Sequence, residues 1–211
     1  MPAKLSLFRV IAFACLLVAS ASSSYAVTPA LTFSRGQTWI YEGTVSWQQG
    51  TTVKRRRVRV ATRVLETFSY PQTFVAVVRS FPSELVWYGD TSRPQYSLLA
   101  LTSAGLFQLE AESDKAARSL AKDFHRLRQE LNTSKDAIIG FPLTEGKPFR
   151  SLVAGVRPSR SLTVYRSIHQ TNPDHTIIDF VPRLGVVRYI YEHHGTVSAV
   201  DVKLVKIIRK G

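Results

Sequence analysis

Residues 177–208 form a run of strand-like residues broken only by Pro182, Gly185 and Gly195, and this run constrains the fold more than any other feature of the chain. Within it, apolar residues such as Val187, Tyr189 and Tyr191 recur at every second position, and such alternation is typical of β-strands that bury one face. His194–Gly195 divides the segment and suits a two-residue turn, because these residues can adopt positive φ. That turn puts Tyr189 on an apolar face and places Arg188 opposite Asp201 on the other face. The segment therefore predicts an antiparallel hairpin.

A second hairpin is predicted for residues 38–63, where the same alternation recurs. A turn at Gln49–Gly50 places Glu42 opposite Arg57 on the polar face. Further strands are predicted at residues 73–80, 84–88, 96–101 and 105–110, each bounded by turn residues. The apolar pairs of the hairpin are Trp39 with Val60 and Tyr41 with Val58.

The apolar spacing changes to steps of three and four in residues 113–131, which predicts one amphipathic helix. Ser113 or Asp114 can cap its first turn. The helix could cover one face of the sheet, close a cavity inside a curled sheet, or lie on a membrane surface. Its narrow apolar stripe favours packing on protein. The whole chain is thus predicted to be mainly β, with a curled, half-barrel-like antiparallel sheet of about nine or ten strands and one amphipathic helix.

Residues 1–26 have the pattern of a secretory signal peptide: a basic start, a short apolar run, and Ser24-Tyr25-Ala26 as a small-x-small cleavage site. We therefore expect a secreted or periplasmic protein in which residues 27–211 form a single domain. Cys15, the only cysteine, lies in the expected signal. The mature chain would then have neither a disulfide nor a cysteine nucleophile.

The chain is strongly basic, with a formal net charge of +13 and a pI near 10.2. Removal of the signal, which carries Lys4 and Arg9 and no acid, leaves +11. A basic surface favours lipid headgroups, anionic envelope polymers or nucleic acid, and export makes nucleic acid an unexpected partner. A basic protein that is simply soluble remains an alternative.

Basic residues concentrate on the second strand of the predicted first hairpin. Lys54 and Arg56 fall on the aromatic face near the hairpin tip. This strand is either an anion-binding edge or cationic cavity rim, or a solvated edge that resists aggregation. The basic residues on its opposite face are Arg55, Arg57, Arg59 and Arg63.

The sequence contains no motif for known catalytic chemistry. It lacks Gly-x-Ser-x-Gly, His-Glu-x-x-His, a Walker-type glycine loop and paired cysteines. His169 and His175 would face each other across a third hairpin, with Asp174 alongside and Asp179 opposite Tyr165. His169, His175 and Asp174 could ligate a metal, but a loop of polar residues accounts for them without a metal. We predict no catalytic residue, metal or cofactor, and hence a non-enzymatic protein.

Two functional hypotheses follow from these patterns. The first is an envelope protein that binds an apolar or amphiphilic, lipid-like ligand between sheet and helix, with possible peripheral membrane contact. The second is an interaction module that binds anionic envelope polymer through Arg55, Arg57, Arg59 and Arg63. An unrecognised enzyme is a third reading, and the oligomeric state is not indicated. The ligand-binding residues of the first hypothesis are Trp39, Tyr41, Trp47, Lys54, Arg56, Val58, Val60, Phe124 and Tyr189.

Two glycine-containing segments carry a resemblance to a known group. They are Phe141-Pro142-Leu143-x-x-Gly146-x-x-Phe149 and Val181-Pro182-x-x-Gly185-Val186-Val187. The chain resembles uncharacterised bacterial secreted proteins with Pro-Leu-x-x-Gly-x-x-Trp and Pro-Gly-x-Gly-x-Val segments. It departs from them at Phe149 and at Arg183-Leu184. The resemblance implies a curled sheet similar in outline to the half-barrels of periplasmic lipoprotein carriers, and it implies no catalytic residues.

Overall fold

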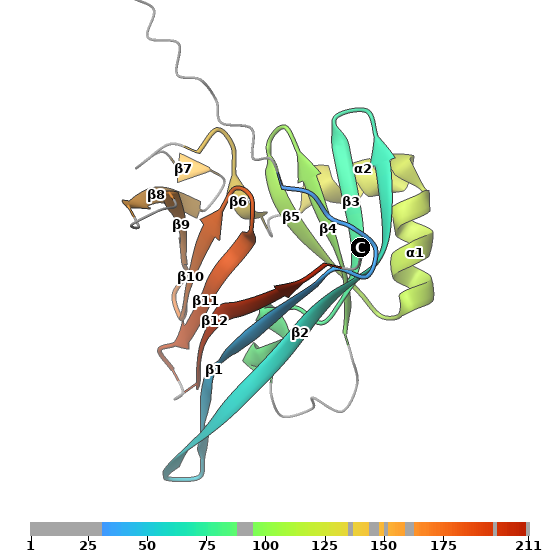
Figure 1. Cartoon of the computed structure of the whole chain (residues 1–211). Coiled ribbons are helices and arrows are strands. Elements are labelled where there is room, and N and C mark those ends of the chain that lie inside the picture. Colours follow the sequence, from blue (N-terminus) through green and yellow to red (C-terminus); the bar gives the residue numbers. More distant parts are fainter. Residues whose placement is uncertain are drawn as a thin grey trace, which may run out of the picture.

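The computed structural model describes residues 31–87, 95–134, 137–143, 148–149, 152–158, 163–195 and 198–209. The expected signal segment lies outside these ranges. Twelve strands form one antiparallel sheet with the spatial order β6-β5-β4-β3-β2-β1-β12-β11-β10-β9-β8-β7 (Figure 1). The sheet curls until β6 lies near β8 and β10. The predicted fold class, a curled antiparallel sheet with helical cover, is confirmed.

The elements that precede the helices are β1 (Thr38–Gln49), β2 (Thr52–Tyr70), β3 (Thr73–Arg79), the short 3-10 helix η1 (Pro82–Trp87), β4 (Tyr96–Thr102) and β5 (Gly105–Ala111). The helices are α1 (Asp114–Lys122) and α2 (Phe124–Thr133). The remaining strands are β6 (Ala137–Gly140), β7 (Pro148–Phe149), β8 (Leu152–Pro158), β9 (Thr163–Gln170), β10 (Asp174–Val181), β11 (Gly185–His193) and β12 (Ser198–Ile208).

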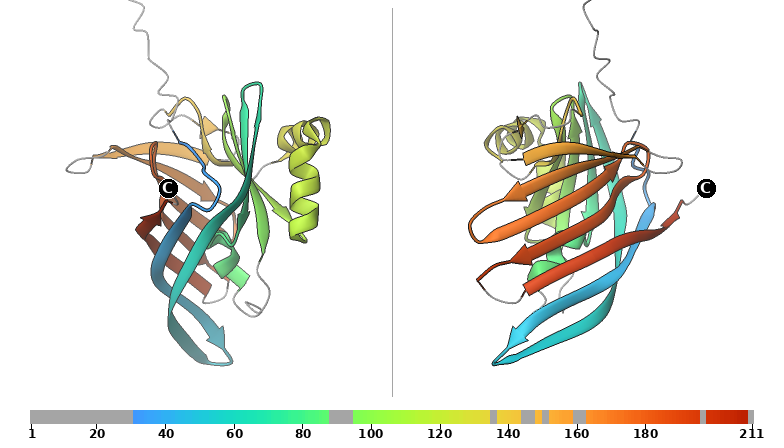
Figure 2. Two further views of the ribbon diagram at one scale, coloured as in Figure 1. Left: turned by 45° about the vertical axis from the view of Figure 1, so that its right-hand side comes forward. Right: turned by 90° about the vertical axis from the view of Figure 1, so that its left-hand side faces the viewer.

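Strand β2 joins the two halves of the sheet because it is much longer than its neighbour β3. Along residues 52–63 it pairs with β1, and from Arg63 to Tyr70 it pairs with β3. The tip of the β1–β2 hairpin therefore projects beyond the rest of the sheet (Figures 1 and 2). A register shift between Val64 and Glu66 adjusts β2 to β3 at the point where the pairing changes.

The first and last predicted hairpins exist, but each register differs from the prediction by two residues. Glu42 lies opposite Arg59 rather than Arg57, because the turn is formed by Gly50 and Thr51, with Gly50 at φ 61°. In the last hairpin Arg188 lies opposite Lys203. A shift of two residues preserves the face of every side chain. The predicted apolar faces are thus confirmed although the predicted partners are wrong.

The facing residues in the first and last hairpins differ from the predicted pairs accordingly. Arg188 still forms a bidentate ion pair with Asp201, its diagonal neighbour, at 2.8 and 3.0 Å. The other observed partners are Trp39 with Thr62, Tyr41 with Val60, Tyr189 with Val202 and Tyr191 with Val200.

The third hairpin differs from its prediction by one residue, which changes the face of its side chains. His175 lies opposite Gln170, so the two predicted histidines do not face each other. Asp179 lies opposite Arg166 rather than Tyr165. The two side chains form a nearly buried bidentate ion pair at 2.6 and 2.8 Å. The loop closes through contacts at Thr171, whose N–H donates to the Asp174 carbonyl.

The predicted strand at residues 84–88 is wrong, because residues 84–87 belong to η1, and residue 88 lies outside the described residues. Pro82 starts the helix, a position that its fixed φ suits. The N–H of Phe81 donates to the Glu84 carboxylate at 2.8 Å, which satisfies a backbone donor at the helix start. Ser80 reverses the chain with φ 60°.

The single predicted helix is also wrong, since Asp123 divides it into α1 and α2. The Asp123 carboxylate accepts a hydrogen bond from the Arg126 N–H at 3.0 Å and thereby caps α2. Ser113 caps α1 as predicted. Both helices pack on the outer face of β3–β5 (Figures 1 and 2). The division keeps Ala117 of α1 and Leu127 of α2 buried against the same sheet surface.

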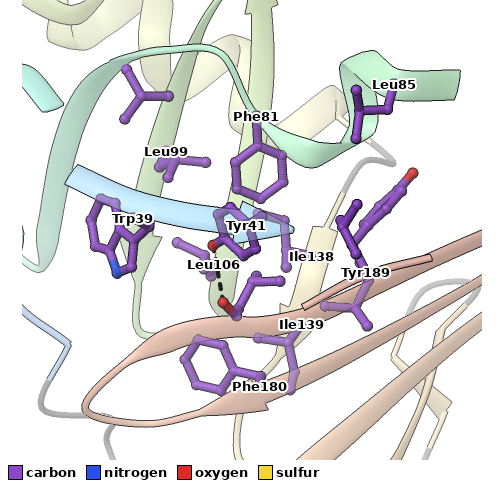
Figure 3. Close-up of a cluster of buried hydrophobic side chains, with 14 of the residues drawn as sticks. Trp39, Tyr41, Phe81, Leu85, Leu99, Leu106, Ile138, Ile139, Phe180 and Tyr189 are labelled. Carbon is purple, nitrogen blue, oxygen red and sulfur yellow. Dashed lines mark hydrogen bonds between the residues drawn. The ribbon is translucent and has the colours of Figure 1, made fainter. Parts of the chain in front are cut away.

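Two apolar cores lie on the two faces of the sheet. The outer core packs β3–β5 against the helices, with Val75 and Val77 fully buried. The inner core fills the inside of the curl and joins both halves of the chain (Figure 3). Strand β3 supplies both cores, since Ala76 and Val78 point inward. Such burial on two faces explains its continuous apolar sequence.

Candidate anion-binding groove

Along much of β2, the edge on the β3 side pairs with no strand among the described residues. Strand β3 ends at Arg79, directly opposite Arg63, and the chain then turns away into η1. Among the described residues, no strand pairs with that side of β2 from Thr52 to Thr62. We call this stretch the free edge. Its backbone N–H and C=O groups that point away from β1 lack a strand partner there.

A groove of about 720 Å³ lies between the free edge and η1. This volume is within the range of roughly 300–1,000 Å³ that is common for ligand pockets. Five arginines line it, four from β2 and one from the end of β3, and we call it the cationic groove. These residues are Arg56, Arg57, Arg59, Arg63 and Arg79, and all five are exposed.

Four of these five arginines have no ion-pair partner among the described residues. Only Arg59 has one, the exposed Glu42 carboxylate, 3.5 Å from its Nε. Arg63 and Arg79 face each other across neighbouring strands, an arrangement that destabilises a sheet unless an anion balances it. Arg57 lies opposite the uncharged Thr44. The groove therefore has an excess of unneutralised positive charge.

Among the described residues, Glu84 of η1 is the one acid that lines the groove. Partial burial, with a smaller repulsion from Glu110, raises the pKa of its carboxyl to about 7. The Phe81 N–H and the Ser80 side chain donate to it and oppose this rise. Near neutral pH the carboxyl is therefore close to half protonated, and it offsets little of the charge of the arginines.

The inner side of the groove is apolar. Val58 and Val60 are half-buried, and across the groove Phe81 and Leu85 belong to the inner core. On one side of the free edge β2 thus presents the guanidinium groups of Arg57 and Arg59, and on the other side it presents Val58 and Val60 next to Arg56. An anionic ligand with an apolar part matches both sides.

The aromatic residues predicted to line a ligand space are instead buried in the inner core. Trp39 is 3% exposed and Tyr41 is 2% exposed. The Trp39 Nε1–H donates to the Leu184 carbonyl at 2.9 Å, and the Tyr41 hydroxyl donates to the Val186 carbonyl at 3.0 Å (Figure 3). Burial raises the pKa of the Tyr41 and Tyr189 hydroxyls well above the ordinary value.

The space around these aromatic groups is filled. The void beside Trp39 and Tyr41 has a volume of about 10 Å³, close to the minimum for one water molecule. Phe33 contacts Trp39 edge to face, with ring centroids 5.8 Å apart. The inside of the curl, so far as its residues are described, is thus a packed core.

The other predicted residues lie in three separate places. Phe124 packs in the outer core, stacked on Tyr70 with ring centroids 4.5 Å apart, on the opposite face of the sheet from Trp39. Trp47 packs against the inner core near the projecting hairpin tip, where Lys54 is exposed. Only Arg56, Val58 and Val60 of the predicted ligand-binding set line the cationic groove.

Three of the four residues in the alternative anion-binding set lie together in the groove. Arg57, Arg59 and Arg63 line the groove, whereas Arg55 points toward β1, where its guanidinium donates to the Thr44 hydroxyl at 3.4 Å. Sequence reasoning missed Arg79 and Glu84. No local pattern indicates that the end of β3 and a short helix meet this half of β2.

A second hollow, of about 810 Å³, lies between β5 and the helices. Its lining carries Glu110, Glu112 and Glu130 against the single base Arg126, which lies 4.0 Å from Glu130, so this hollow is acidic and does not suit an anion. The described residues contain no group of three or more metal-ligating side chains. His175 stacks near His194, with ring centroids 6.4 Å apart. Within the described ranges, no helix has the length and apolar character to span a membrane.

Comparisons with known proteins give structural likenesses only. No family model matches the chain, and no curated protein matches it. One similar solved structure is a Bacteroides fragilis protein, inferred to be exported and described as having a YmcC-like fold. It is 12% identical, with a TM-score of 0.40 over 85% of this chain and 98% of its own. A DUF1329 family protein from Desulfovibrio piger is 12% identical, with a TM-score of 0.20 over 82% and 85%.

Proposed function

We propose that the chain is an exported, non-enzymatic binding protein of the cell envelope that takes an anionic ligand in the cationic groove. The observation that carries this proposal is that Arg57, Arg63 and Arg79 line one groove. None of the three has a carboxylate partner among the described residues. Guanidinium groups bind carboxylate, phosphate and sulfate groups through charge-assisted hydrogen bonds. Export is supported by the signal-like pattern of residues 1–26.

A lipid-like ligand inside the curl has less support. Among the described residues of the inner core, the void beside Trp39 and Tyr41 has about 10 Å³, which is far too small for an acyl chain. An amphiphile could still place its headgroup in the groove, with Val58 and Val60 beside its first apolar groups. The function that the geometry favours is therefore recognition of anionic groups rather than enclosure of an apolar molecule.

Binding of dextran sulfate, with neutral dextran as the blank, tests this proposal. The double variant Arg57→Glu/Arg63→Glu should bind at least tenfold more weakly than the wild-type protein. Lys122→Glu/Arg128→Glu is a matched control, because it makes the same charge change at exposed positions of α1 and α2. Binding by the wild-type protein should also weaken as sodium chloride is raised from 0.05 to 0.5 M.

Equal losses in the two double variants would contradict the proposal, because net charge alone would then explain binding. Unchanged binding by the groove variant would contradict it as well. Circular dichroism of both variants checks that the fold is retained. Phosphatidylglycerol vesicles, compared with phosphatidylcholine vesicles, show whether the anion can be a lipid headgroup.

A further inference from the structure

We infer that the anionic ligand of the cationic groove is an extended acidic segment of another protein, which adds to the free edge of β2 as an extra strand. This inference rests on the proposed anion-binding role and names the partner of the same site. An added strand would occupy the row of the sheet that β3 leaves at Arg79. Strand addition of this kind obtains affinity from main-chain hydrogen bonds and specificity from alternate side chains.

The geometry of the free edge suits a strand rather than a compact anion. Its eleven residues, Thr52 to Thr62, extend over about 35 Å at the usual rise per residue. Pairing with β1 uses the backbone groups on only one side of this stretch. The other side is a row of donors and acceptors that another backbone can pair with. A sulfate or phosphate group would satisfy the arginines but would leave this row without partners.

The side chains of β2 indicate the pattern that the partner strand should have. Arg57 and Arg59 lie on one side of the free edge, where they would attract acidic residues. Val58 and Val60 lie on the other side, next to Arg56, and they would pack against apolar residues. Facing side chains on paired strands interact directly. Opposite residues 57–60 the partner should therefore alternate acidic and apolar residues.

Charge argues against a second copy of this chain as the occupant. Two free edges paired with each other would bring two sets of basic residues together, and like charges on facing strands are destabilising. The basic residues of one free edge are Lys54, Arg55, Arg56, Arg57 and Arg59. The same side chains that prevent self-association attract an acidic strand.

Three synthetic eleven-residue peptides test this inference with the purified protein. The first alternates glutamate and valine, and the second has the same composition with glutamates and valines in two separate blocks. The third is the alternating peptide with N-methyl groups on the backbone amides of one edge. The alternating peptide should bind at least tenfold more tightly than either of the others. It should also slow hydrogen exchange at every second amide from Thr52 to Thr62.

The outcomes separate this inference from the proposed function. Equal binding of all three peptides, lost in Arg57→Glu/Arg63→Glu, would overturn strand addition and retain the anion-binding groove. Binding of dextran sulfate or phosphatidylglycerol vesicles without any peptide binding would have the same meaning. If neither peptides nor the other polyanions bind, both proposals fail. Tight binding of the alternating peptide with no added protection at residues 52–62 would place the peptide elsewhere and contradict the inference.

Discussion

Replacement of Glu84 by glutamine should make the protein more stable above pH 7 and should flatten its pH dependence. In the folded protein the pKa of this carboxyl is raised from 4.5 to about 7, chiefly by burial. A raised folded-state pKa means that the folded protein holds the proton more tightly than the unfolded chain. The resulting stability is fully present below pH 4.5 and is lost as the pH rises through 7.

The size of the effect can be bounded from this shift. Each pKa unit corresponds to about 1.4 kcal/mol, so an increase from 4.5 to about 7 gives at most about 3.5 kcal/mol. Glu84 is half-buried, and solvent screening reduces the value to about 1–2 kcal/mol. Glutamine keeps a side-chain oxygen that can accept the Phe81 N–H. The substitution thus removes the charge without removing the hydrogen bond.

Urea unfolding at pH 5 and pH 8, followed by circular dichroism, measures this effect in wild-type and Glu84→Gln proteins. The wild-type protein should lose about 1–2 kcal/mol more stability between these pH values than the variant does. Glu110→Gln is a suitable control, because Glu110 makes only a minor contribution to the shift. Parallel pH profiles for the wild-type protein and Glu84→Gln would refute the reasoning.

Two further predictions concern the sheet. Asp179→Asn should destabilise the protein by about 3 kcal/mol because it leaves the Arg166 charge buried and unpaired, whereas the double variant Arg166→Met/Asp179→Leu should lose much less. Urea unfolding of both variants measures this, and an equal or larger loss in the double variant would contradict it. Gly43→Ala should cost about 1–3 kcal/mol, since the new Cβ would lie 1.9 Å from the Asp201 carbonyl oxygen of β12. Thermal unfolding measures this cost, and an unchanged midpoint would show that β1 can move away from β12.

The faces of the strands in the first and last hairpins could be predicted from the sequence, but the registers could not. Alternation decides which side chains point inward, and it survives any shift by an even number of residues. The first hairpin shows this, because its turn lies at Gly50–Thr51 rather than Gln49–Gly50, and Tyr41 still points inward. The third hairpin shifts by a single residue, which moves Asp179 to Arg166. Turn residues alone do not discriminate between such closely related loops.

The groove shows a second limit of sequence reasoning. The basic residues of β2 are evident in the sequence, and their face follows from alternation. Arg79 joins them only because β3 stops at Arg63, where the chain reverses at Ser80 with φ 60°. Glu84 joins them because η1 replaces the predicted strand. Both contributions depend on contacts between distant segments, which no local spacing encodes.

The composition of β2 changes where its neighbour ends. From Val64 onward the strand is paired with β3 and covered by α1, and its outer side chains include Phe68 and Tyr70 in the outer core. Glu66 in this half pairs with Arg118 of α1. Before Arg63, β2 has its free edge, and its outward side chains include Arg55, Arg57 and Arg59. The basic residues of β2 are therefore concentrated in the part of the strand that has the free edge.

Two observations favour binding over simple protection of that edge from aggregation. A protective edge needs charge only on the bare strand itself. Arg79, however, comes from the end of β3 and faces Arg63, where a like-charge pair costs stability in the absence of an anion. Val58 and Val60 also leave apolar surface beside the groove, which protection from aggregation would not require. A site that recognises an acidic, partly apolar strand accounts for both features.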